Sequence, residues 1–129
     1  MATGAYRAAL AHCQRSLKLD EQTQGAESPD VALDLACLGE AQLGLGAPER
    51  ALPLLERARS IHEKAWLDRR DSARTSFLLA RALWTRRAPE ERTRALELAK
   101  EARDWLEAQG LRTRQELREL VAWQEKAGR

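Results

Sequence analysis

Residues 51–61 read ALPLLERARSI, and residues 9–19 read ALAHCQRSLKL at an offset of 42. Small residues, a Leu, a large apolar residue, an Arg and an aliphatic residue recur in step in the two segments. A third, weaker copy starts at Ala95, at an offset of 44 from Ala51. Self-similarity with a period of about 20–50 residues indicates stacked structural repeats.

The composition predicts that these repeats are helical. The chain holds 23 Ala and 21 Leu against two Val and one Ile. Ala and Leu are the strongest helix formers, whereas β-branched residues favour strands. Aromatic residues make up only 5% of the chain, so a core of Ala and Leu requires a close approach of neighbouring helices. A chain of this length fits a single domain, 1–129.

Helix starts and stops divide the chain into six segments. Pro29, Pro48 and Pro89 stand where helices are expected to begin, because a first-turn position loses no hydrogen bond to proline. Gly46 and Gly110 stand where left-handed C-terminal caps are expected. The six predicted helices span 4–24, 29–45, 48–67, 72–87, 89–109 and 113–127.

A pattern of small and large residues spans the second and third segments. It consists of Leu35, Leu38, Gly39, Gln42, Ala51, Leu55 and Ala58. Gly39 and Ala51 are small, which lets the two helices of a pair pack closely, and Leu55 fills the gap between them. This pattern resembles that of tetratricopeptide repeats, and the resemblance covers about residues 5–109. Gln42 departs from it, because an aromatic residue is usual there.

The resemblance implies an all-α fold, an α-solenoid of stacked antiparallel helix pairs with a C-terminal capping helix. The period and the linker GAESPDVA at residues 25–32 are similar to the longer repeats of kinesin light chains. Such repeats also trail the catalytic domains of large bacterial signalling proteins, including serine/threonine kinases. The implied function is a non-catalytic protein–protein interaction module, an accessory region of such a signalling or regulatory protein.

The net charge, the lack of long apolar runs and the two cysteines indicate where the protein is located. The net charge is +2, which gives little attraction to nucleic acid or membranes. No apolar run approaches the roughly 18 residues of a membrane span, and the N-terminus lacks a signal-peptide core. Cys13 and Cys37 form no CxxC pair. We therefore expect a cytoplasmic protein with reduced thiols, in which Cys13 fills an apolar position and Cys37 either does the same or faces a groove.

Catalytic and cofactor motifs are missing from the sequence. His12 and His62 belong to no metal-binding spacing, and no Gly-rich phosphate loop or nucleophile elbow is present. We therefore expect no enzyme activity, no metal and no cofactor. Several arginines lie between residues 69 and 94, with Phe77 and Trp84 among them in the sequence. Such aromatic side chains could stack on the bases of a nucleic acid. Acidic residues are interleaved with them, so nucleic-acid binding is the less favoured alternative.

The resemblance implies that ligands bind on a concave face lined by the first helix of each pair. The groove residues carried over are Leu33, Cys37, Glu40, Arg74, Phe77, Arg81 and Trp84. The last four recur on one side of a helix and are of types suited to an acidic or carboxylate-bearing peptide. Two alternatives remain open for Phe77 and Trp84, namely burial in the core and a surface for self-association into a homo-oligomer.

Overall fold

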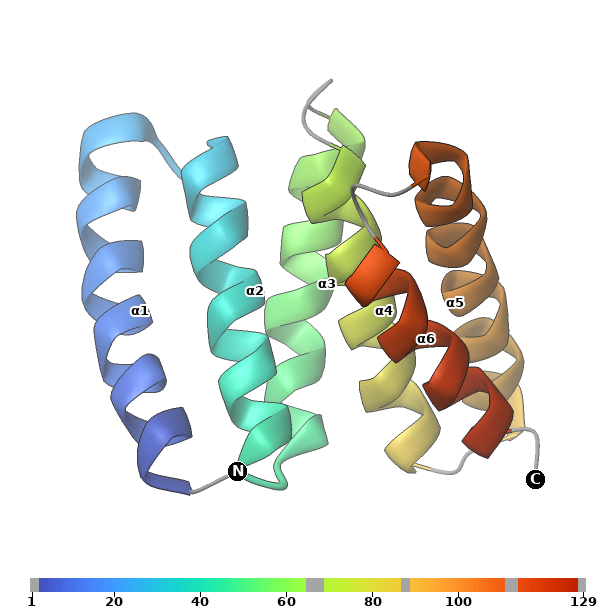
Figure 1. The fold of residues 1–129 in the computed structure, drawn as a ribbon. Coiled ribbons are helices and arrows are strands. Elements are labelled where there is room, and N and C mark those ends of the chain that lie inside the picture. Colours follow the sequence, from blue (N-terminus) through green and yellow to red (C-terminus); the bar gives the residue numbers. More distant parts are fainter. Residues whose placement is uncertain (1–2, 65–68, 87–88, 111–113, 128–129) are drawn as a thin grey trace. The chain divides into compact units, whose positions relative to one another are not determined.

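The computed structural model of the chain describes residues 3–64, 69–86, 89–110 and 114–127. Within these ranges the chain contains only helices and their connections, and no strand (Figure 1). The helices are α1 (Thr3–Gln24), α2 (Pro29–Gly44), α3 (Pro48–Lys64), α4 (Arg69–Arg86), α5 (Pro89–Gln109) and α6 (Arg114–Ala127). The predicted all-α fold of antiparallel, pairwise-packed repeat helices is therefore confirmed.

The chain forms two compact units, Met1–Leu67 and Asp68–Arg129. The N-terminal unit contains α1, α2 and α3, and the C-terminal unit contains α4, α5 and α6. The predicted helix limits at 67, 87 and 113 lie outside the described residues. No helix in the described part of the chain has both the length and the apolarity needed to cross a membrane.

The helix ends follow the local signals in the sequence. Helices α2, α3 and α5 begin at their prolines, as predicted. After α2 the backbone turns left-handed at Gly46, with φ +77°. The Ala47 N–H donates to the Gln42 carbonyl at 2.8 Å, and the Gly46 N–H donates to the Leu43 carbonyl at 3.0 Å. This pair of bonds is a Schellman cap. Its left-handed residue is Gly46, the glycine predicted to cap this helix.

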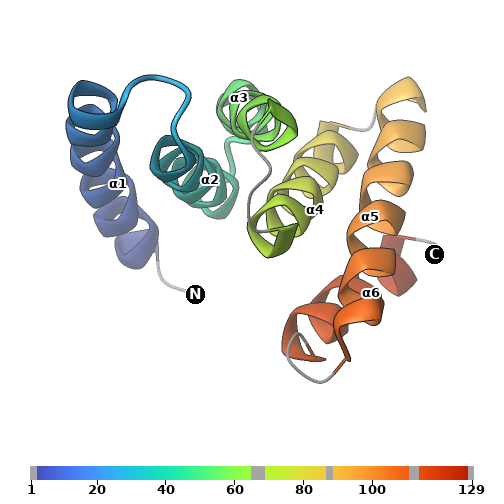
Figure 2. The same cartoon turned by 90° about the horizontal axis from the view of Figure 1, so that it is seen from above.

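In the N-terminal unit, α2 lies between α1 and α3 (Figure 2). A Cβ atom added to Gly39 of α2 would lie 2.5 Å from Cδ2 of Leu55 in α3. Leu55 is fully buried, so it has little room to move away. The predicted close contact over Gly39, filled by Leu55, is therefore confirmed.

The core of the N-terminal unit continues toward the other end of the α2–α3 pair. Its buried members are Val31, Ala32, Leu35, Ala58 and Ile61, with Leu17 and Leu54 packed against them. Leu17 is the contribution of α1 to this cluster. The N–H of Val31 also donates to the Ser28 side chain at 3.3 Å, which caps the start of α2.

The C-terminal unit has its own core, formed by all three of its helices. Buried apolar residues come from α4, α5 and α6, namely Ala73, Phe77, Ala102, Leu106 and Leu120. The Arg103 side chain of α5 donates to the amide oxygen of Gln124 in α6 at 3.0 Å. Helix α6 thus covers the α4–α5 pair within this unit, as expected of a capping helix.

Candidate functional site

The predicted groove residues fall on two helices. Leu33, Cys37 and Glu40 lie on α2, and the four remaining residues, from Arg74 to Trp84, lie on α4. Because α2 and α4 belong to different units, each set defines a surface of its own. The two surfaces differ in what surrounds them.

On α2, the structure corrects the prediction of reduced thiols. Cys13 of α1 and Cys37 of α2 form a disulfide, with their Cα atoms 6.3 Å apart. Cys13 is buried, as predicted, but it is bonded rather than a free thiol. The prediction was wrong because it considered only the sequence spacing of the cysteines. Antiparallel packing of α1 on α2 brings the two positions face to face.

The disulfide also changes what the α2 surface can offer to a ligand. Helix α1 covers Cys37, which is half-buried. Leu33 remains 44% exposed near the start of α2, and Glu40 is half-buried. A continuous binding strip along α2 through Cys37 is therefore interrupted by α1.

On α4, the two aromatic residues pack against α6. The Phe77 ring lies 5.8 Å from the Trp123 ring at an interplanar angle of 78°, and Trp84 lies 5.9 Å from Trp123 at 75°. Both pairs are edge-to-face contacts, the favoured arrangement for aromatic rings. Phe77 is only 8% exposed, whereas Trp84 is half-buried. The core alternative therefore describes the packing of Phe77, and Trp84 keeps part of its surface.

Two arginines stand over these rings. The guanidinium carbon of Arg81 lies 5.8 Å from the centre of the Phe77 ring. That of Arg92, on α5, lies 4.8 Å from the centre of the Trp84 ring. Cation–π contacts of this kind attract the guanidinium group to the face of the ring and so help to position the arginine. The basic side chains of this surface are thus positioned by the aromatic residues beneath them.

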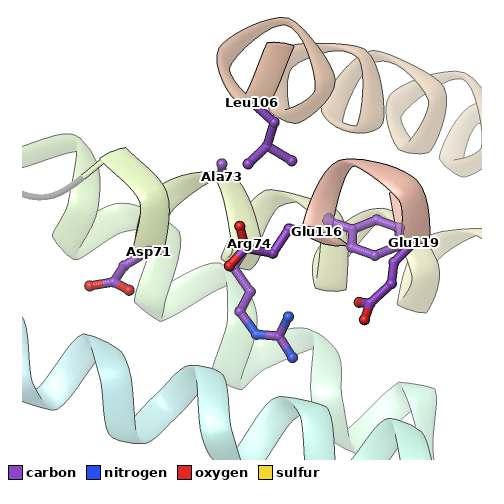
Figure 3. Close-up of a pocket in the computed structure, with 7 residues that line it drawn as sticks. Asp71, Ala73, Arg74, Leu106, Glu116 and Glu119 are labelled. Carbon is purple, nitrogen blue, oxygen red and sulfur yellow. The ribbon is translucent and has the colours of Figure 1, made fainter. Parts of the chain in front are cut away.

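A small cavity of about 50 Å³ opens beside Arg74 and Phe77 (Figure 3). Its lining comes from all three helices of the C-terminal unit: Asp71, Ala73, Arg74, Phe77, Leu106, Glu116 and Glu119. Three of these residues are apolar, one carries a guanidinium group and three carry carboxylates. The cavity can therefore accept a small apolar group with a polar group beside it.

The sequence predicted only two of these lining residues, Arg74 and Phe77. The carboxylates of Glu116 and Glu119 come from α6, which the repeat pattern treats only as a cover. Figure 3 shows Glu119 and Arg74 extending from α6 and α4 on the same side of the cavity. No signal in the sequence relates α6 to α4, because the pairing of a cap with its repeat depends on tertiary packing.

Among the described residues, no group of three His, Cys, Asp or Glu side chains could hold a metal ion. Asp34 of α2 has a clearly shifted pKa. Burial, followed by a hydrogen bond with Asp20, raises the pKa of Asp34 to about 6. Asp34 lies on α2 beside Asp20 of α1 and therefore concerns the contact between α1 and α2.

The sequence model of the tetratricopeptide repeat family matches residues 1–64. The chain therefore belongs to the tetratricopeptide repeat family, with the match lying in its N-terminal half. Members of this family generally mediate protein–protein interactions and are typically non-catalytic. No significant match was found among curated proteins or among solved structures.

Proposed function

We propose that the chain is a non-catalytic module that binds a segment of a partner protein, and that the C-terminal unit carries the binding surface. Family membership supports the class of function. The observation that carries the location is the cavity beside Arg74, because it joins an apolar floor to an exposed guanidinium group. Arginine beside buried aromatic residues is typical of sites that dominate binding energy.

The chemistry of the cavity suggests the form of the ligand. A ligand carboxylate would pair with Arg74, and a small apolar side chain would contact Phe77 and Leu106. Asp71, Glu116 and Glu119 also face this space, and their charges would repel a long acidic run. The proposed ligand is therefore a peptide with one carboxylate next to a small apolar residue.

The more specific predictions about cellular context rest on the similarity of the sequence to the longer repeats of kinesin light chains and of bacterial signalling proteins. The linker at residues 25–32 supports the proposal that the chain is an accessory region of a bacterial signalling or regulatory protein. A cytoplasmic location and a capacity for self-association likewise remain proposals.

The experiment selects peptides from a random displayed library on the immobilised full chain and then measures their affinities. The comparison is between wild type, Arg74→Ala and Lys100→Ala, which also removes an exposed positive charge, from α5. We expect Arg74→Ala to weaken binding about tenfold or more, as at a hot-spot arginine, and Lys100→Ala to leave the affinity unchanged. Equal losses in both variants, or selected peptides without a carboxylate, would contradict the proposed site.

A further inference from the structure

Helix α1 contacts α2 through a short series of positions along one side of α2. Tyr6 packs against Gly44, where an added Cβ would collide with the tyrosine ring. Cys13 is bonded to Cys37 in the middle of the contact. Toward the end of α1, Asp20 faces Asp34. Positions 34, 37 and 44 of α2 share one helix face, which is the face that α1 covers.

Apart from Cys13, the side chains of α1 in this contact are at most half-buried. Among residues 4–24, whose side chains the structure describes, Cys13 is the only one that is buried. Leu19 is 59% exposed. Leu17 packs against the core of the unit, but it is only half-buried. Since the stabilisation from apolar contact scales with the area removed from water, half-buried side chains contribute less than fully buried ones.

The acidic pair Asp20 and Asp34 further weakens the contact once Asp34 is charged. Asp20 accepts a long hydrogen bond of 3.5 Å from Ser16, and its carboxylate lies next to Asp34. Asp30 also contributes negative charge from α2 itself. The pKa of Asp34 is raised to about 6, chiefly by burial, so above that pH two charged carboxylates oppose each other across the contact.

The end of α1 and the loop after it are held differently. Arg57 of α3 donates to the Glu21 carboxylate at 3.0 Å and to the Ala26 carbonyl at 3.1 Å. Lys64 of α3 reaches Glu27 at 3.4 Å. These bonds fasten the last turn of α1 and its loop to α3. The first turns of α1 are attached by the disulfide and by half-buried contacts such as that of Tyr6 with Gly44.

We propose that the Cys13–Cys37 disulfide is a redox latch, which keeps the first turns of α1 on α2 when oxidised and lets them detach when reduced. Detachment uncovers the α2 face that contains Asp34, Cys37 and Gly44, while α2 and α3 stay packed on each other through Gly39 and Leu55. The latch is a property of the N-terminal unit, and it does not depend on the proposed binding surface in the C-terminal unit.

Opening requires a dithiol reductant. Cys37 is the more exposed partner, so a thiolate of the dithiol attacks its Sγ, and the bond to Cys13 breaks to release a Cys13 thiolate that takes up a proton. The second thiol of the reductant then displaces Cys37 from the mixed disulfide. Two electrons and two protons have moved, leaving two protein thiols and one disulfide in the reductant.

Hydrogen–deuterium exchange of the full chain tests the latch, with dithiothreitol as the reductant. We expect reduction to lower the protection of amides 7–18 by on the order of a hundredfold. Amides of α2 and α3 should keep their protection, and those of α4 and α5 serve as an internal reference. A Cys13→Ser/Cys37→Ser variant should match the reduced wild type and should not respond to dithiothreitol.

Three outcomes would overturn the proposal. One is a reduced chain in which α1 stays as protected as before. Another is a loss of protection that extends through α2 and α3, because the bond would then be a structural staple of the whole unit. The third is a chain that still presents two reactive thiols after incubation with oxidised glutathione.

Discussion

The first and last helices, α1 and α6, are fastened to their units by different means. Helix α6 is held by apolar packing: Leu120 is fully buried, and Trp123 contacts both Phe77 and Trp84. Helix α1 is held by one disulfide and by half-buried side chains such as Tyr6 and Leu17. The attachment of α6 depends on noncovalent packing alone. The attachment of α1 depends also on whether Cys13 and Cys37 are oxidised.

The difference has a consequence for function. Helix α6 supplies part of the cavity lining in the C-terminal unit, and this lining contains no cysteine. The covalent attachment of α1 can be broken without disturbing the α2–α3 pair. The attachment of α6 therefore does not involve the disulfide, and variants can test each attachment separately.

The largest effect is expected at the packed helix. Leu120→Ala removes a fully buried side chain and should lower the free energy of unfolding of the C-terminal unit by about 3 to 4 kcal/mol, since deep Leu→Ala changes leave a cavity. Leu96→Ala is the matched control, because Leu96 is 45% exposed. Urea unfolding monitored by tryptophan fluorescence measures both. Similar losses in the two variants would show that α6 is not anchored by its core contacts.

Removal of the disulfide should have a slightly smaller effect, confined to the other unit. The bond joins residues separated by 24 positions, and closing a loop of this size is worth about 3 kcal/mol in the chain-entropy model. Urea unfolding of Cys13→Ser/Cys37→Ser, followed by circular dichroism, should show this loss in a non-reducing buffer. In dithiothreitol the variant and the wild type should unfold together, and a persistent gap would mean that the serines themselves perturb the contact.

In the N-terminal unit, the close contact between α2 and α3 should not tolerate a larger side chain at position 39. Gly39→Ala places a methyl group against buried Leu55, so overpacking outweighs the better helix propensity of alanine and costs about 2 kcal/mol. Gly4→Ala is the control, since nothing lies within 4 Å of its added Cβ. Thermal unfolding should show a lower midpoint for Gly39→Ala alone. Tolerance of Gly39→Ala would contradict the close approach of α2 and α3.

The smallest effect concerns Asp34. Its pKa of about 6 in the folded chain exceeds the ordinary value of 3.8. Between these two pH values, the folded state therefore holds a proton that the unfolded state has lost. This contribution to stability is complete below the ordinary value and disappears as the pH rises through about 6. At pH 7, Asp34→Asn should therefore be more stable than wild type by about 1 kcal/mol, allowing for solvent screening.

At pH 4 this advantage of Asp34→Asn should vanish. Asp104→Asn, at an exposed position on α5, should show no such pH dependence. Denaturant titrations of the three proteins from pH 4 to pH 7 make the comparison. An Asp34→Asn advantage that is constant across this range would rule out the acidic pair as its cause.

Local features of the fold could be predicted from the sequence, because each depends on a few neighbouring residues. Pro29, Pro48 and Pro89 mark helix starts through a missing N–H, and Gly46 marks an end through its left-handed backbone. The Gly39–Leu55 contact could also be predicted, since the repeat pattern encodes the packing within a helix pair. These signals are carried by the repeat itself.

Features outside the repeat pattern could not be predicted in the same way. The Cys13–Cys37 bond depends on which faces of α1 and α2 meet, and sequence spacing does not encode this. The same holds for Glu116 and Glu119, which reach the cavity only because α6 packs on α4 and α5. The predicted residues Arg74 and Phe77 belong to the cavity because the repeat pattern places them on one side of α4.

The most direct test of the binding surface is nuclear magnetic resonance of the isotope-labelled chain, titrated with a selected carboxylate-containing peptide. We expect the largest chemical-shift changes at amides of residues 71–77 and 116–119, around the cavity. Changes confined to the N-terminal unit, or an absence of changes at saturating peptide, would contradict the assignment of the binding surface to the C-terminal unit.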